Sequence, residues 1–279
     1  MKFNGLKLFD YNEDELHKQF GKTLDTTYHV KPKHGQLKLL LNEIYFIHEM
    51  LNKYNKIEYI FVCGGAPGIH YDLLSDMYSD IRFVLYDKVK FYGKLYSKKN
   101  IIIKPTYFNS YIAKTIGDTF HNSLFISDMR TLEIEESKEN ETKINSIYLS
   151  DMYQQMAFFR LTKCKSFMLK FKVPLNMTIP YLDGIILIQP FIFSNEMRLV
   201  GFDDSAIKYY NGNEIERQAQ LVNNYWKTFE LEMTTEEANF IKKYNLKNNW
   251  DNISLFNILK YSNKLDYVDR VVKFIKKSA

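Results

Sequence analysis

Residues 58–68 read Glu-Tyr-Ile-Phe-Val-Cys-Gly-Gly-Ala-Pro-Gly and decide the fold of this chain. Residues 58–63 are apolar enough for a short buried strand, and the glycines after them permit a sharp turn close to a ligand. A helical pattern follows over residues 69–78, and a second strand over residues 81–86 ends at Asp87. Strand, glycine-rich turn, helix and strand in this order are typical of a doubly wound sheet that binds a nucleotide-like cofactor.

Strands and helices alternate on both sides of this stretch. Ahead of it, residues 36–54 repeat apolar side chains at helical spacing. After it we predict strands at 101–103, 123–127, 164–172, 184–189 and 197–202, and helices at 111–117, 147–161, 214–231, 234–244 and 253–261. We therefore predict an α/β fold of the Rossmann-like class, in which a doubly wound, mostly parallel sheet carries helices on both faces.

The length of 279 residues allows one large domain with a substantial core. We predict a single domain with an N-terminal arm (1–33), a core (34–205) and a C-terminal helical part (206–279). The charged stretch 132–145 is interpreted as a solvated loop of the core. The net charge of +5 permits nucleic-acid binding without requiring it, because many ordinary enzymes are as basic.

The two cysteines, Cys63 and Cys164, lie in apolar strand-like runs and are predicted to be buried thiols. The sequence contains no Cys/His group with zinc spacing, so no metal site is predicted. It shows neither the apolar region of a signal peptide nor a run long enough to span a membrane. We therefore expect a soluble, cytoplasmic protein with no membrane partner.

The glycine-rich turn is the predicted cofactor site. It comprises Gly64, Gly65, Ala66, Pro67 and Gly68. Asp87, which ends the next predicted strand, can accept hydrogen bonds from both ribose hydroxyls of an adenosine cofactor, or else be an ordinary turn-forming residue. The turn lacks the Gly-x-Gly-x-x-Gly spacing, and Pro67 has no N–H to donate to a pyrophosphate, so S-adenosylmethionine is favoured over NAD.

Four charged residues in separate segments are the candidate catalytic group: Lys38, Asp128, Lys170 and Glu196. Lys170 is the most unusual, because lysine is rare in an apolar strand unless it is paired. The others have ordinary structural alternatives. Lys38 could be a solvated helix lysine, Asp128 could cap a turn, and Glu196 could pair with Arg198 on a sheet surface.

The order Lys-Asp-Lys-Glu, together with the glycine-rich turn, resembles the ribose 2′-O-methyltransferases. Residues 34–41, 66–70 and 194–199 resemble more closely the poxvirus cap-specific mRNA 2′-O-methyltransferase family, whose members are also processivity subunits of the viral poly(A) polymerase. The similarity covers residues 35–217. It implies a class I methyltransferase fold, S-adenosylmethionine as cofactor, a viral source, and methylation of the ribose 2′-O of the first transcribed nucleotide of capped mRNA.

Within this resemblance Lys170 is the expected general base. A ribose hydroxyl is a poor nucleophile, and a lysine can take its proton only if its pKa falls from ~10.4 toward ~7–8. Lys38 and the cationic sulfonium would supply the like charge that lowers this pKa. Asp128 and Glu196 would orient the two ammonium groups.

The resemblance also assigns cofactor contacts. Gln36 and Asp128 are expected at the methionine end of the cofactor, and residues 102–106 beside the adenine. His70 follows the turn and is expected to support the cofactor site from the helix start rather than to act as a base.

A methylated guanine cap is electron-poor and binds well between aromatic rings with a carboxylate beside it. The resemblance points to Phe193 for one ring and to Glu216, with Glu214 as its rival, for the carboxylate. At Leu175 this chain departs from the family, which has a ring there. The remaining expected contacts are a second ring from Phe20 or Tyr28 and phosphate contacts from Lys163, Lys165, Lys172 and Arg198.

Three functions remain open at this point. The first is methylation of the capped mRNA 5′ end. The second is a non-catalytic subunit whose partner is the catalytic subunit of a poly(A) polymerase. The third is a ribosomal or transfer-RNA 2′-O-methyltransferase, which would share the four charged residues and the turn.

Overall fold

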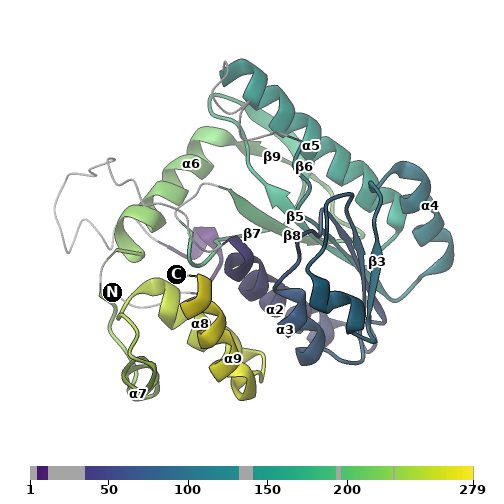
Figure 1. Ribbon diagram of the computed structural model, residues 1–279. Helices are drawn as coiled ribbons and strands as arrows, with labels where there is room; N and C mark the ends of the chain where they lie inside the picture. The colour runs from purple at the N-terminus through teal and green to yellow at the C-terminus, as the bar shows by residue number, and fades with distance from the viewer. Residues whose placement is uncertain (1–4, 12–34, 132–140, 193–195, 229, 279) are drawn as a thin grey trace. The chain divides into compact units, whose positions relative to one another are not determined.

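A computed structural model describes residues 5–11, 35–131, 141–192, 196–228 and 230–278 (Figure 1). The chain packs as two compact units. The first unit consists of Met1–Tyr45, Ile186–Met197 and Glu214–Ala279, and the second consists of Phe46–Ile185 and Arg198–Asn213. These boundaries differ from the predicted division into arm, core and C-terminal part, and the single methyltransferase domain stays a prediction.

The seven-stranded sheet has the strand order β3-β2-β1-β4-β5-β8-β7. The second unit contains β1 to β5 and most of β8, whereas Ile186 and Leu187 of β7 belong to the first unit. The strands are β1 (Tyr59–Cys63), β2 (Arg82–Tyr86), β3 (Ile101–Lys104), β4 (Ser123–Ser127), β5 (Ser166–Phe171), β7 (Ile185–Leu187) and β8 (Met197–Phe202). From β3 across to β5 every neighbouring pair is parallel. This confirms the predicted Rossmann-like, doubly wound sheet.

The strand order reverses direction between β1 and β4, so that the chain winds outward on both sides of this pair. In open α/β sheets ligands bind beyond the carboxyl ends of the strands at such a switch point. The register aligns Cys63 with Ser127 as the last residues of β1 and β4. The glycine turn and Asp128 follow directly, so the topology places both predicted features at this edge.

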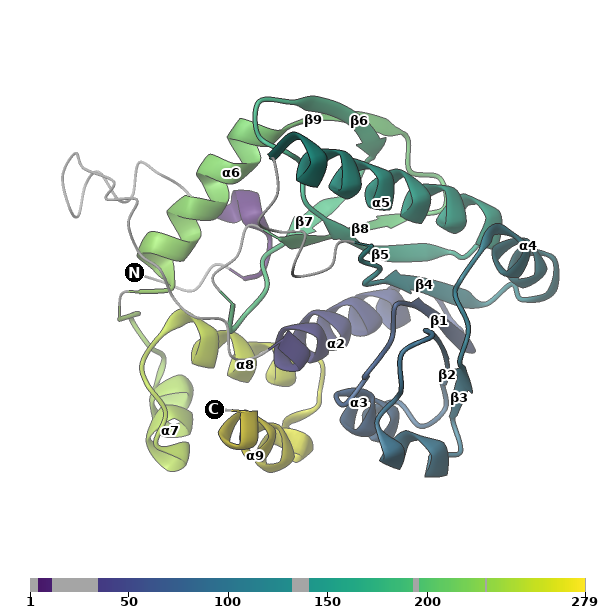
Figure 2. The same ribbon diagram turned by 45° about the horizontal axis from the view of Figure 1, so that its top comes forward.

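Helices cover both faces of the sheet in the second unit. Figure 2 shows α3 (Tyr71–Met77) on one face and α4 (Ser110–Thr119) and α5 (Glu141–Thr162) on the other. This arrangement follows from right-handed crossovers that run in opposite directions from the switch point. Because the sheet is covered twice, its central strands are rich in apolar residues, and β4 is buried at every residue, including Ser123 and Ser127 at its ends.

Two features of the second unit differ from the sequence prediction. Helix α5 begins at Glu141, so the predicted loop 132–145 is wrong over its last residues, while 132–140 lie outside the described part of the chain. A separate antiparallel pair, β6 (Thr178–Leu182) with β9 (Ile207–Asn211), was not predicted. Pro180 lies inside β6, and proline argues against a strand unless that strand lies at an edge.

The first unit is mainly helical. Its elements are η1 (Leu8–Asp10), the part of α2 (Gly35–Lys53) up to Tyr45, α6 (Gly212–Leu221) from Glu214, the π-helical η4 (Val222–Trp226), α7 (Thr235–Tyr244), α8 (Trp250–Tyr261), η5 (Leu265–Tyr267) and α9 (Val268–Ser278). The predicted helix 214–231 is therefore too long, and α9 was not predicted. In the described residues we find no helix long and apolar enough to span a membrane.

Several helix starts follow from capping side chains in the sequence. The side chain of Asn109 accepts a hydrogen bond from the Ile112 N–H at the start of α4, and Asn249 does the same at the start of α8. Thr234 and Glu237 form a reciprocal capping box at the start of α7. Each cap satisfies a backbone N–H that the helix itself cannot pair.

Both cysteines are free and buried, as predicted. Burial raises the pKa of Cys63 to about 12 and that of Cys164 to about 11. Neither thiol is poised for nucleophilic chemistry, because the thiolate is the reactive form.

Candidate active site

The glycine turn is folded tightly against the end of β2. The N–H groups of Gly64 and Gly65 both donate to the carbonyl oxygen of Tyr86, at 3.0 and 3.2 Å. Gly64 has φ +78°, and a Cβ at this position would lie 2.9 Å from the backbone carbon of Asp128. Only glycine therefore allows the turn and the Asp128 backbone to approach this closely.

Asp87 connects the end of β2 to this turn. Its Oδ2 accepts from the Ala66 N–H at 3.1 Å, and its Oδ1 accepts from the Val89 N–H at 2.9 Å. A carboxylate has about four acceptor positions, so each oxygen can accept one more hydrogen bond. The position and the remaining acceptor capacity both fit a ribose diol, which agrees with the predicted role.

The structure tells less about the roles of the other predicted cofactor residues. Gly68 has φ +66° and closes the turn, where a Cβ would lie 2.7 Å from the Gly65 carbonyl oxygen. His70 is buried at the start of α3 with its ring centroid 4.1 Å from that of Tyr71, which fits the predicted supporting role. Gln36 lies in the first turn of α2 and belongs to the first unit, so its cofactor contact stays a prediction.

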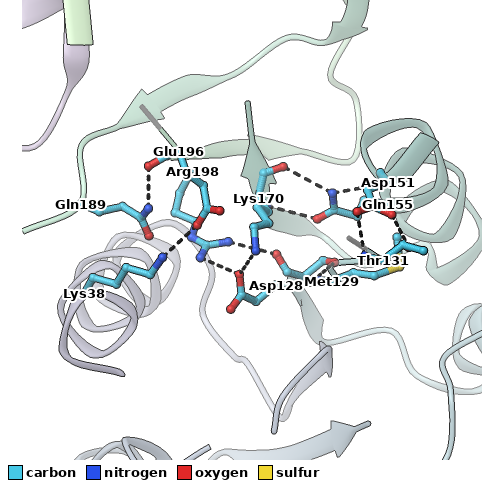
Figure 3. Close-up of polar contacts among 11 residues, drawn as sticks. Lys38, Asp128, Met129, Thr131, Asp151, Gln155, Lys170, Gln189, Glu196 and Arg198 are labelled. Atoms are coloured by element: carbon cyan, nitrogen blue, oxygen red, sulfur yellow. Dashed lines mark hydrogen bonds and ion pairs between the residues drawn. The ribbon is translucent and has the colours of Figure 1, made fainter. Parts of the chain in front are cut away.

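Asp128 holds two cations in the second unit (Figure 3). Its Oδ1 lies 3.0 Å from Lys170 Nζ and 2.8 Å from Arg198 Nη2. The Arg198 side chain is 1% exposed and that of Lys170 is 11% exposed. One carboxylate charge is thus divided between two partly desolvated cations, and the group carries a net charge of about +1 when all three are ionised.

The backbone around this group is fixed by hydrogen bonds to neighbouring elements. The Asp128 N–H donates to the Cys63 carbonyl oxygen at 2.9 Å. Gln155 on α5 accepts from the Lys170 N–H at 3.2 Å and donates to the Lys170 carbonyl oxygen at 3.4 Å (Figure 3). The sequence analysis did not identify Gln155. No local signal marks Gln155, because the same side of α5 also carries the buried polar residues Asp151 and Thr162.

In the first unit, Lys38 pairs with Glu196. Their Nζ and Oε1 atoms lie 2.8 Å apart, and both residues are buried. Lys38 comes from the first turn of α2, and Glu196 directly precedes β8. The Glu196 carbonyl oxygen accepts from Gln189 Nε2 at 2.6 Å. Buried lysines and carboxylates of this kind are rare unless they are paired, as here.

The four predicted catalytic residues thus form two ion pairs, one in each unit. Lys38 and Glu196 are in the first unit, and Asp128 and Lys170 are in the second. A single residue, Met197, separates Glu196 from Arg198 in the sequence. That all four serve one reaction stays a prediction.

Among the predicted RNA-binding residues, the structure gives new information on Arg198. Its guanidinium is buried against Asp128 instead of being exposed as a phosphate contact requires. Lys163 pairs with Asp118, and Lys165 Nζ donates to the Asn122 side chain. Both lysines precede β5, whereas Lys170 lies near its carboxyl end, so they lie at the opposite edge of the sheet from Lys170.

The predicted cap residues are only partly described. Leu175 is exposed after β5, and Lys172 Nζ lies 4.7 Å from the ring centroid of Tyr148, an aromatic residue that the sequence analysis did not select. Glu216 lies on α6 and accepts from Gln220 at 3.1 Å. The predictions for Phe20, Tyr28 and Phe193 lie outside the described residues.

Comparison with known proteins supports the resemblance seen in the sequence. The chain is 28% identical to the cap-specific mRNA (nucleoside-2′-O-)-methyltransferase of Fowlpox virus (strain NVSL) over 68% of its own length, and it spans 65% of that protein. A structure of an uncharacterized protein from Listeria monocytogenes serotype 4b matches 88% of this chain and 100% of its own, at 10% identity. Its TM-score of 0.34 is too low to support any conclusion.

The family assignment comes from a match over nearly the whole sequence. The family model described as the poly A polymerase regulatory subunit matches residues 7–277. By this match, the chain belongs to the poly A polymerase regulatory subunit family.

Proposed function

We propose that this chain is an S-adenosylmethionine-dependent methyltransferase that acts on the ribose 2′-O of the first transcribed nucleotide of capped mRNA. The observation that carries this proposal is the Lys170–Asp128–Arg198 group at the carboxyl ends of β4 and β5. This group lies at the same edge of the sheet as the glycine turn. The similarity to a cap-specific methyltransferase supports the substrate class.

The turn and Asp87 are the residues that would hold the cofactor. Gly64 and Gly68 allow the turn to fold this tightly, because a Cβ at either position would collide with neighbouring backbone of the protein. Asp87 would accept hydrogen bonds from the ribose hydroxyls. When bound, the cofactor supplies an electrophilic methyl group on a sulfonium.

Lys170 would act on the methyl acceptor. In its neutral form, its Nζ would accept the 2′-OH proton and so make the ribose oxygen a nucleophile toward the methyl group that the cofactor would supply. Arg198 supports this role because it contacts the same Asp128 oxygen as Lys170. The permanently charged guanidinium would hold the carboxylate in place beside the lysine.

The Lys38–Glu196 pair would complete the group. We propose that Lys38 adds positive charge on the acceptor side and that Glu196 holds it in place. Removing Glu196 would take away the carboxylate that pairs with the buried Lys38 ammonium, which is costly.

The deciding experiment measures methyl transfer to a short capped RNA by the wild type and by Lys170→Arg, with cofactor affinity measured by calorimetry. Arginine keeps the positive charge but cannot accept a proton. We expect the rate to fall by ~100-fold or more while cofactor affinity changes little. Lys114→Arg, at an exposed position of α4 in the same unit, is the matched control and should stay active. Retention of ~10% of the wild-type rate by Lys170→Arg would refute the base assignment.

A second candidate function is regulation of a poly(A) polymerase, and the family match over residues 7–277 favours it. The proposed partner is the polymerase catalytic subunit, and the two functions can coexist on one chain. The Lys170→Arg variant separates them. If it stimulates a poly(A) polymerase as well as the wild type does, the regulatory role is independent of methyl transfer.

A third candidate is methylation of uncapped RNA, favoured by Leu175, which stands where a cap-stacking ring is expected. Equal rates on capped and uncapped RNA of the same sequence would support it and exclude cap specificity. For the cap-specific function the proposed location is the cytoplasm.

A further inference from the structure

Lys227 is a lysine enclosed in the interior of the first unit. It is 3% exposed and follows the π-helical segment Val222–Trp226. Its Nζ donates to the backbone carbonyl oxygens of Gln189 at 2.8 Å and Ile192 at 2.7 Å. The Nζ also lies 5.0 Å from the ring centroid of Trp250. Single π-helical turns are rare and are often found at functional sites.

The turn that Lys227 holds is itself strained. Phe191 has φ +62°, a left-handed conformation that a bulky residue adopts only when its surroundings impose it. The Phe191 N–H donates to Asp251 Oδ1 at 2.8 Å. Lys227 therefore holds two carbonyl oxygens of the turn and Asp251 holds the N–H between them, and together they fix the strained backbone.

This turn leads directly to the predicted catalytic pair of the first unit. Gln189, whose carbonyl oxygen accepts from Lys227, donates through its side chain to the Glu196 carbonyl oxygen at 2.6 Å. The Glu196 side chain then pairs with Lys38 at 2.8 Å (Figure 3). A continuous series of hydrogen bonds thus runs from Lys227 through Gln189 and Glu196 to Lys38.

Burying the Lys227 ammonium costs folding free energy. Burial lowers its pKa to about 8, against the opposing effect of the nearby Asp251 carboxylate. An apolar residue of similar length would avoid the cost of desolvating an ammonium. Lysine is useful here because its ammonium can donate to both carbonyl oxygens of one turn, whereas a methionine can donate to neither.

We propose that Lys227 is a positioning residue for methyl transfer, which fixes the turn 189–192 and, through Gln189, the Glu196 carboxylate against Lys38. This inference rests on the proposed function. Lys227 acts through other residues and does not itself touch the substrate. Its removal should therefore change the geometry of Glu196 before it changes the fold.

The test compares Lys227→Met with the wild type by two readouts. The first is amide hydrogen exchange of peptides covering residues 186–192. The second compares the change in kcat on capped RNA with the change in affinity for S-adenosylmethionine. We expect exchange in residues 186–192 to rise ~10-fold or more and kcat to fall ~10- to 100-fold, with cofactor affinity nearly unchanged.

Ile258→Ala is the control for a general loss of stability, because Ile258 is buried in α8 of the same unit but has no part in the hydrogen-bond series. It should lower stability without the local rise in exchange or the loss of kcat. If Lys227→Met does not fold, Gln189→Met is measured instead. This variant keeps the carbonyl oxygen that Lys227 holds and removes the side-chain link to Glu196, so kcat should still fall.

The outcomes separate this inference from the proposed function. If the wild type transfers no methyl group, the proposed function fails, and the exchange data alone decide whether Lys227 fixes the turn. If the wild type is active, unchanged exchange in residues 186–192 or an unchanged kcat in the variant overturns the positioning role. An equal loss of kcat in Ile258→Ala at matched stability also overturns it.

Discussion

Arg198 and Lys170 donate to the same oxygen of Asp128, at 2.8 and 3.0 Å. The group therefore differs from an ordinary ion pair, in which one carboxylate compensates one ammonium. Sequence analysis expected Lys38 to supply the like charge beside Lys170. In the second unit the cation that shares the Asp128 carboxylate with Lys170 is Arg198, and the role of Lys38 stays a prediction.

Replacing Arg198 should therefore impair methyl transfer without removing any residue that takes a proton. In Arg198→Met the Asp128 carboxylate loses the buried guanidinium that helps to hold it beside Lys170. We expect kcat to fall by ~10-fold or more, because the lysine is then less well positioned toward the acceptor. Methyl transfer to capped RNA by the variant and by the wild type measures this. An unchanged kcat would mean that Arg198 has no part in methyl transfer.

Asp87 provides the corresponding test at the cofactor site. We expect Asp87→Ala to weaken S-adenosylmethionine binding by ~1–3 kcal/mol, because charge-assisted hydrogen bonds to a ribose would be lost. Calorimetric titration measures the affinity directly. Asp118→Ala is the control, since Asp118 pairs with exposed Lys163 in the same unit. Equal affinity in Asp87→Ala and Asp118→Ala would remove Asp87 from the cofactor site.

Gly64 is predicted to tolerate no side chain. In Gly64→Ala the new Cβ would lie 2.9 Å from the Asp128 backbone, at a residue with φ +78°. We expect a loss of stability of ~1–3 kcal/mol in urea denaturation and weaker cofactor binding, since Asp128 must shift. Gly93→Ala is the control, because a Cβ there meets nothing within 4 Å. Similar stabilities for the two variants would contradict this account of the turn.

The sequence predicted well where the strands of the large sheet and the glycine-rich turn lie along the chain. Buried parallel strands are continuous apolar runs, and a glycine-rich turn between them is easy to recognise. The prediction failed where local pattern and structure disagree. Strand β6 was missed because it contains Pro180. The π-helical turn at Val222–Trp226 was missed because the sequence after residue 214 has an ordinary helical pattern. Lys227 looked like any lysine of a helix, since burial depends on contacts between segments distant in the sequence.

The candidate site shows the same limit. Asp128 and Lys170 were both selected from the sequence, because a strand end and an apolar strand give each a recognisable setting. The structure brings their side chains together as an ion pair, and their catalytic role stays a prediction. Arg198 was predicted to contact phosphate, as isolated surface arginines do. Only the structure shows that its guanidinium is buried on Asp128, because sequence does not reveal which carboxylate a cation finds.

Leu175 offers a gain-of-function test of cap recognition. It is exposed at the position where the resemblance expects an aromatic ring. We expect Leu175→Phe to bind a 7-methylguanosine cap analogue more tightly than the wild type, by about 0.5–2 kcal/mol, through stacking with a charged base. Fluorescence titration measures the affinity, with unmethylated GTP as the control ligand. Unchanged affinity for the methylated analogue would show that the cap base does not bind next to residue 175.

Lys227 should make the stability of the folded protein depend on pH in a defined direction. Its folded pKa of about 8 lies below the ~10.4 of an unfolded lysine. Between these values the unfolded state binds more protons at this lysine than the folded state, so the contribution of Lys227 to the free energy of unfolding should rise with pH from about 8 to 10 and be constant below 8. The buried thiols Cys63 and Cys164 contribute in the opposite direction, because burial raises their pKa values, so the lysine is measured as a difference between two proteins. Urea denaturation at pH 7.5 and pH 10 should show a change in the free energy of unfolding that is about 1–3 kcal/mol more positive in the wild type than in Lys227→Met. If both proteins show the same pH dependence, Lys227 is not a buried, titrating ammonium.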